Sequence, residues 1–157
     1  MRPLSAPSAW LSCPRPDAAA PLRLFCLPFA GAGVSAWVPW AARLTGVAEI
    51  VAVRLPGRES RLAEKPFNEF APLVARLAEA LTPHLGERYA LCGHSMGALL
   101  AFELARTLRG QGQPGPAALI VSGARAPDVP RDEPDLHTLS DDAFVAEVDR
   151  RYGGIPA

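Results

Sequence analysis

Short apolar runs alternate along this chain with longer segments in which apolar residues recur every three or four positions. Runs of four to seven residues, three of them rich in the apolar residues of buried strands, predict four β-strands. They cover residues 22–27, 49–55, 89–92 and 117–122. Helical segments lie between the strands, so the connections are crossovers, which produce a parallel sheet with helices on both faces. The predicted fold class is α/β.

Three segments carry the periodicity of amphipathic helices. One face of the pattern in residues 67–85 collects Phe70, Leu73, Val74, Leu77, Ala78 and Leu81. Residues 96–112 carry a second pattern, which Gly110 ends. A third pattern has Ser140 as its N-cap, two aspartates in its first turn and an apolar stripe that stops before Gly153.

The amino-acid composition and the net charge disfavour some classes of binding partner. The chain has 157 residues, 49% of them hydrophobic and 20% charged, which is typical of one soluble globular domain. Sixteen basic and sixteen acidic residues give no net charge, so we expect neither nucleic acid nor a membrane as a partner. No run approaches the roughly 18 apolar residues that a membrane span requires. Three widely spaced cysteines, Cys13, Cys26 and Cys92, indicate free thiols and a cytoplasmic location.

The first twenty residues are rich in proline and lack an apolar stretch of signal-peptide length. We therefore expect a flexible leader over residues 1–20 and a folded core over residues 21–127. Residues 128–157 form a separate segment. We expect a monomer that uses neither a cofactor nor a metal ion.

The stretch "CGHSMG" places a serine between a predicted strand and a predicted helix. Ser95 has a glycine two residues before it and another two residues after it, Gly93 and Gly97. This G-x-S-x-G pattern in a strand-to-helix context predicts a nucleophile elbow, a strained turn that raises the serine hydroxyl above the sheet edge. His94 lies inside the elbow, and we expect its side chain to be structural. The N–H of Met96, at the start of the helix, is a natural donor to a developing oxyanion.

A second oxyanion donor is expected in the loop after the first predicted strand. The loop "LPFAGAGVSAW" contains Gly31 and Gly33, which allow its backbone to approach a ligand closely. The N–H of Ala30 could then point at the same oxygen as that of Met96. A plain glycine-rich turn is the alternative interpretation of this loop.

The same loop also matches a dinucleotide-binding fingerprint, with Gly31, Gly33 and Ala36 in the pattern G-x-G-x-x-A. Two features oppose that interpretation, the separation of the strand from the first glycine and the proline at position 39. The second predicted strand ends with Arg54, where NAD binding requires an acidic residue, although an arginine could serve the 2′-phosphate of NADP. An NADP-binding oxidoreductase domain therefore stays open as an alternative.

Several stretches in this order resemble the type II thioesterases that accompany polyketide and nonribosomal peptide synthetases, members of the α/β-hydrolase fold. The stretches are "LFCLPFAGAG", "VAVRLPGRESR", "YALCGHSMGALLAFELAR", "SGARAP" and "RRYGGIP". The resemblance implies that Ser95 is the nucleophile and that the amides of Ala30 and Met96 form the oxyanion hole. It also implies an editing enzyme that hydrolyses acyl groups from the phosphopantetheine arm of acyl or peptidyl carrier proteins.

The sequence departs from the family in the partners of the serine. In α/β-hydrolases an acid and then a histidine follow the serine on loops after later strands. Only Asp128 and His137 keep this order here, without an intervening strand, and the resemblance places the true pair beyond residue 157. We therefore expect a core that is incomplete at its C-terminus, with residues 128–157 as the start of a helical lid. A truncated, non-catalytic fragment that only binds carrier proteins is the main alternative to an active thioesterase.

Overall fold

The computed structural model describes residues 8–86, 88–129 and 136–153. The chain forms two compact units, Met1–Ala124 and Arg125–Ala157. Among the described residues, the first unit contains the sheet and its covering helices, and the second contains helices over Leu136–Thr138 and Asp141–Tyr152. Each unit is described by itself.

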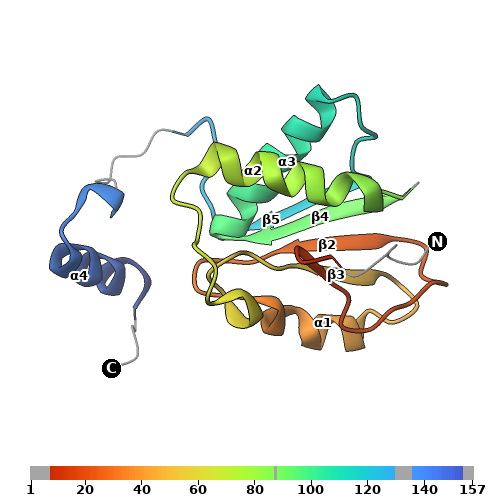
Figure 1. Cartoon of the computed structure of the whole chain (residues 1–157), viewed down its shortest axis with the longest axis horizontal. Coiled ribbons are helices and arrows are strands. Elements are labelled where there is room, and N and C mark those ends of the chain that lie inside the picture. Colours follow the sequence, from red (N-terminus) through yellow and green to blue (C-terminus); the bar gives the residue numbers. More distant parts are fainter. Residues whose placement is uncertain (1–7, 87, 130–135, 154–157) are drawn as a thin grey trace. The chain divides into compact units, whose positions relative to one another are not determined.

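The first unit is built on a five-stranded sheet in the order β1-β3-β2-β4-β5 (Figure 1). The strands are β1 (Leu11–Ser12), β2 (Arg23–Leu27), β3 (Glu49–Val53), β4 (Tyr89–His94) and β5 (Ala118–Ser122). β1 pairs antiparallel with β3, and the other neighbours are parallel. The predicted α/β class is confirmed, and each of the four predicted strands is present with its ends shifted by at most two residues.

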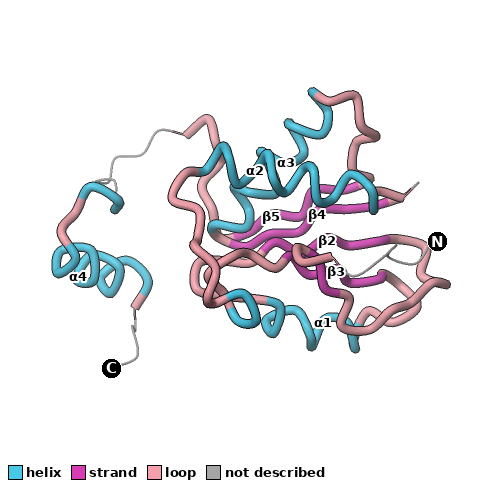
Figure 2. Tube along the Cα trace, viewed as in Figure 1, coloured by secondary structure: helices cyan, strands magenta, loops and turns pink. Residues whose placement is uncertain are grey.

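Helices cover both faces of this sheet (Figures 1 and 2). α2 (Phe70–Leu81) and α3 (Met96–Gly110) lie on one face, and α1 (Val38–Arg43) lies on the other. Both longer helices lie within the segments that the periodicity predicts. α1 was not predicted, because it is only six residues long and carries Pro39 in its first turn, where proline is tolerated.

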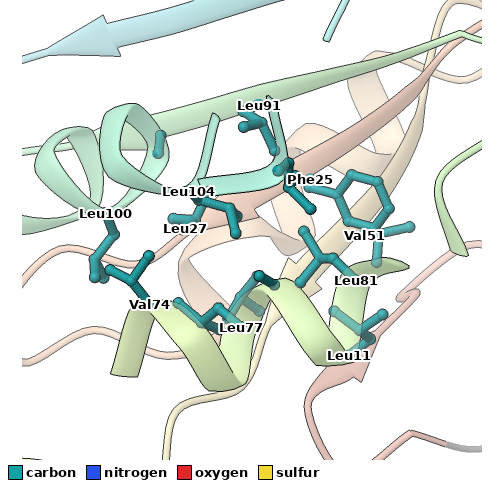
Figure 3. Close-up of a cluster of buried hydrophobic side chains, with 14 of the residues drawn as sticks. Leu11, Phe25, Leu27, Val51, Val74, Leu77, Leu81, Leu91, Leu100 and Leu104 are labelled. Atoms are coloured by element: carbon teal, nitrogen blue, oxygen red, sulfur yellow. The ribbon is translucent and has the colours of Figure 1, made fainter. Parts of the chain in front are cut away.

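Strand alternation divides the core into two layers. Odd-numbered strand residues such as Phe25, Val51 and Leu91 face α2 and α3, where they meet Leu77 and Leu104 (Figure 3). Even-numbered residues face α1, and several of them are small. They include Leu24, Cys26, Ile50, Ala52, Ala90 and Cys92. Because β2, β3 and most of β4 are buried on both faces, their sequences are almost continuously apolar.

The structure corrects the expectation of a flexible leader for residues 8–20. Leu11 is 3% exposed in β1 and packs into the α2–α3 layer. The Arg54 guanidinium holds this segment, since its Nη2 donates to the carbonyl oxygens of Ser8 at 2.9 Å and Leu11 at 2.7 Å. Residues 1–7, the rest of the expected leader, lie outside the described residues. A strand of two residues is too short to show any periodicity in the sequence.

A buried ion pair lies at the amino ends of β2 and β3. Arg23 and Glu49 are each 2% exposed, and Arg23 Nη2 lies 2.7 Å from Glu49 Oε2. Arg23 also donates to the carbonyl oxygen of His84 at 2.9 Å, which links the pair to the end of the α2 segment. This polar cluster occupies the sheet end opposite Ser95.

The last strand, β5, is exposed along its whole length. Leu119, Ile120 and Val121 are 38%, 47% and 51% exposed. The apolar sequence of β5 is thus suited to burial, but the described residues do not cover it.

The second unit contains α4 (Asp141–Tyr152). Ser140 occupies the predicted N-cap position, but its side chain makes no capping hydrogen bond. Near the other end of α4, Glu147 pairs with Arg150 and Arg151 at 2.6 Å. Of the segment expected to begin a lid, residues 130–135 and 154–157 lie outside the described residues. None of the described helices is long and apolar enough to cross a membrane.

Candidate active site

Ser95 lies at the single residue that separates β4 from α3. Its backbone has φ 52° and ψ −118°, a conformation that L-residues rarely adopt. Among the described residues only Glu59 is another non-glycine residue with positive φ. The side chain of Ser95 is half-buried, and β4 is flanked by strands on both sides. The predicted strained turn between strand and helix is therefore present.

The two glycines around Ser95 are required by close backbone contacts. A β-carbon on Gly93 would lie 2.0 Å from the carbonyl oxygen of Gly97, the second residue of α3. A β-carbon on Gly97 would lie 2.3 Å from the carbonyl oxygen of Leu27, at the end of β2. Neither contact leaves room for a side chain, since backbone atoms cannot rotate away. Together the glycines let α3 start directly against β4 and β2.

The end of β5 also holds the backbone at Ser95. The N–H of Ser95 donates to the carbonyl oxygen of Ser122 at 2.9 Å. Met96 is the first residue of α3, so its N–H has no partner within the helix. This donor and the positive end of the helix dipole lie directly after the serine, where negative charge would develop during acyl transfer.

The loop that follows β2 begins beside the same helix start. Leu27, the last residue of β2, and Pro28, the first residue of the loop, supply the carbonyl oxygens that the Gly97 β-carbon would meet. The loop then turns through Gly31 at φ 81°, with Ala32 N–H donating to Phe29 O at 3.0 Å. Ala30 is exposed within this turn, and among the described residues its N–H has no backbone acceptor. The geometry is compatible with the role in the oxyanion hole that we expect for Ala30.

His94 packs against two segments that border the elbow. Its Nδ1 lies 2.9 Å from Ser122 Oγ, and its ring meets Phe29 edge-on with centroids 5.9 Å apart. A β-carbon on Gly123 would lie 2.3 Å from the His94 ring. These contacts fit the structural role expected for His94, because they tie together the end of β5 and the loop after β2.

A histidine base for Ser95 is not found in the described part of the first unit. His84 is 8% exposed, and burial together with the nearby Arg23 charge lowers its pKa, which favours the neutral ring. It lies beside the buried ion pair at the other end of the sheet. Asp128 is exposed in the second unit, and the side chain of His137 lies outside the described residues. Among the described residues, no cluster of three His, Cys, Asp or Glu side chains could hold a metal ion.

Two observations disfavour the dinucleotide interpretation. The short helix after the loop, Val34–Trp37, has its first N–H groups bound by the Glu59 carboxylate, where a pyrophosphate would otherwise sit. Arg54, the candidate for the 2′-phosphate, is engaged with the N-terminal segment. A carboxylate at that helix start would repel an anionic ligand.

Glu59 is the residue near this site that sequence reasoning missed. It belongs to the stretch "LPGRESR", which contributes only to the family resemblance and carries no motif that marks the glutamate. Its carboxylate accepts hydrogen bonds from residues 24 and 25 positions earlier in the chain. No local pattern reports a contact over that separation.

Comparison with known proteins matches residues 22–157 to the family described as "Thioesterase domain". The gramicidin S biosynthesis protein GrsT of Aneurinibacillus migulanus is 40% identical over 153 residues, which cover 98% of this chain and 59% of GrsT. The linear gramicidin dehydrogenase LgrE of Brevibacillus parabrevis is 38% identical, covering 96% of this chain and 57% of LgrE.

Among solved structures, RedJ, a thioesterase from the prodiginine biosynthetic pathway in Streptomyces coelicolor, superposes with a TM-score of 0.79. It is 48% identical, and the match covers 97% of this chain and 55% of RedJ. The chain thus spans 55–59% of the length of these three relatives.

Proposed function

The chain belongs to the thioesterase domain family, and we propose that Ser95 within it is the nucleophile of acyl-thioester hydrolysis. The resemblance to type II thioesterases and the α/β-hydrolase fold are confirmed by the relatives, which include RedJ and the type II thioesterase BorB from the borrelidin biosynthetic cluster. The observation that carries the proposal is the strained backbone of Ser95 at the junction of β4 and α3. Such strain persists where a reactive side chain must be held exposed.

In the proposed reaction, Ser95 Oγ attacks the carbonyl carbon of an acyl thioester. The carbonyl oxygen becomes an oxyanion, which the N–H groups of Ala30 and Met96 stabilise. Collapse of this intermediate breaks the carbon–sulfur bond, releases the thiol and leaves the acyl group as an ester on Ser95. Water then attacks the ester and releases the carboxylic acid, which restores the hydroxyl.

The serine proton must be removed by a base, which in this fold is a histidine oriented by a carboxylate. Because the chain spans 55–59% of its relatives, we place that pair in a longer protein rather than in the residues described. In this proposal, the present chain supplies the nucleophile and both oxyanion donors, and the longer protein supplies the histidine and the carboxylate.

The proposed substrate is an acyl group on the phosphopantetheine arm of an acyl or peptidyl carrier protein. Its removal would edit a polyketide or nonribosomal peptide assembly line, in line with the biosynthetic names of GrsT and RedJ. The setting that we propose is a cytoplasmic monomer without a cofactor.

The experiment treats the chain, and a form extended to the length of its relatives, with a fluorophosphonate probe and with acyl carrier protein. Labelling and thioester hydrolysis that Ser95→Ala abolishes support the proposal. Hydrolysis by the extended form alone indicates that this chain is a non-catalytic part of the enzyme. If neither form is labelled and neither hydrolyses the thioester, the proposal that Ser95 is the nucleophile is refuted.

LgrE is described as a dehydrogenase, which motivates a test of one alternative, an oxidoreductase. A nicotinamide cofactor that binds the folded chain would raise its melting temperature at millimolar concentration. The Glu59 carboxylate at the start of residues 34–37 leads us to expect no shift with NADP or NAD.

A further inference from the structure

The Glu59 carboxylate joins the segment after β3 to the loop after β2. Its Oε2 accepts a hydrogen bond from Val34 N–H at 2.9 Å. Its Oε1 accepts from Ser35 N–H at 3.1 Å and from Ser35 Oγ at 2.6 Å. One side chain therefore satisfies three donors at the start of the short helix Val34–Trp37.

This contact replaces the local cap that the short helix lacks. Its N-cap residue is Gly33, which has no side chain to offer to the first N–H groups. A β-carbon on Gly33 would lie 2.3 Å from Glu59 Cδ, so the glycine also makes room for the carboxylate. The hydrogen bond from Ser35 Oγ, with those from the two N–H groups, lowers the pKa of Glu59. The charged form is thus the one that the loop binds.

Glu59 is itself held in a strained conformation, with φ 42°. The surrounding turn is closed by Gly57 N–H donating to Arg61 O at 2.9 Å and by Arg61 N–H donating to Arg58 O at 2.8 Å. Arg61 Nη1 donates to the carbonyl oxygen of Arg54 at 2.9 Å, which fixes the turn to the end of β3. A strained residue so well supported points to a function for its side chain.

The two ends of the oxyanion loop, residues 28–35, are thus fixed by different means. At its start, the backbone of Pro28 and of the preceding Leu27, at the end of β2, packs against Gly97 at the beginning of α3. At its end, Val34 and Ser35 are bound by Glu59. Ala30 lies between these anchors in an exposed turn.

We propose that Glu59 is a positioning residue, which holds the Ala30 N–H where it can donate to the oxyanion formed at Ser95. This inference rests on the proposed function, because the position of Ala30 matters to catalysis only if its N–H binds the oxyanion. A hydrogen-bond donor that drifts by about 1 Å can cost about a hundredfold in rate. Ground-state binding of the acyl chain does not depend on this donor, so the effect falls on kcat.

The test compares the wild type with Glu59→Gln and Glu59→Ala, and uses Glu79→Gln as the matched control. Glu79 is a carboxylate on the exposed face of α2 that pairs only with Arg76 among the described residues. Amide hydrogen exchange follows Val34 and Ser35, and kinetics on acyl carrier protein use the longest active form. We expect at least tenfold faster exchange at both amides in Glu59→Ala. We expect kcat to fall about tenfold to a hundredfold with KM nearly unchanged, less in Glu59→Gln, which keeps one acceptor oxygen.

Each outcome decides a separate point. Unchanged exchange at Val34 and Ser35, or unchanged kcat in an active enzyme, overturns the proposal. A fall in kcat matched by an equal effect in Glu79→Gln also overturns it, because the loss is then not specific to the loop. If the wild type is neither labelled nor active, the proposed function fails together with the catalytic part of this inference. The exchange data still decide whether Glu59 holds the loop.

Discussion

A β-carbon on Gly97 would lie 2.3 Å from the carbonyl oxygen of Leu27. Gly97→Ala must therefore push α3 away from the start of the oxyanion loop. We expect a loss of about 1–3 kcal/mol in the free energy of unfolding, as for other overpacked sites. We also expect about a hundredfold slower labelling of Ser95 by a fluorophosphonate.

Gly110, in the last turn of α3, offers a matched control for that change. A β-carbon there would meet nothing within 4 Å. Gly110→Ala is expected to leave labelling unchanged and to stabilise the helix by up to about 1 kcal/mol. Equal labelling rates for Gly97→Ala and the wild type would refute the close-packing argument.

Gly123 faces His94 at the end of β5, with φ 63°. Gly123→Ala would introduce strain of about 1–2 kcal/mol and would displace the His94 ring, since the added carbon lies 2.3 Å from it. Because Ser122 O binds the N–H of Ser95, we expect slower labelling of Ser95 as well. Ser122→Ala removes only the hydrogen bond between side chains and should lower the stability by about 1 kcal/mol. If Ser95 is labelled equally fast in the wild type and in Gly123→Ala, the conformation of Ser95 does not depend on the packing at the end of β5.

The Arg23–Glu49 pair should be costly to break from one side. Arg23→Ala leaves the Glu49 carboxylate buried without its cation, which typically costs about 3–5 kcal/mol. Urea unfolding followed by circular dichroism measures this loss. The double change Arg23→Met with Glu49→Leu should recover most of the stability, because no uncompensated charge remains. A loss below about 1 kcal/mol in Arg23→Ala would mean that the pair is effectively solvated.

Because His84 is buried, we expect the free energy of unfolding to fall at mildly acidic pH. Burial and the Arg23 charge lower its pKa in the folded state, whereas the unfolded chain titrates near the usual value of about 6.5. The unfolded state therefore binds the proton first, and stability is lost as the pH falls below about 6.5 towards the folded pKa. His84→Gln should flatten the dependence of the melting temperature on pH between about 7 and 5. A slope equal to that of the wild type would exclude His84 as the titrating group.

The parallel sheet and the two long helices could be predicted because each is specified by residues close in sequence. The elbow at Ser95 was also predictable, since strand, glycines and helix are contiguous. β1 and the role of Arg54 were not, because a two-residue strand has no periodicity and its anchor lies 43 positions away along the chain. Glu59 was missed for the same physical reason.

Ser95 reaches its strained conformation only with support from both directions along the chain. Leu27, far upstream, meets Gly97, and Ser122, well downstream, binds the N–H of Ser95. During translation, a nascent polypeptide would therefore carry an unreactive serine until β5 has left the ribosome and joined β4. Labelling of Ser95 by the fluorophosphonate would then report that the sheet is complete. We expect a stalled or proteolysed product that ends before β5 to remain unlabelled.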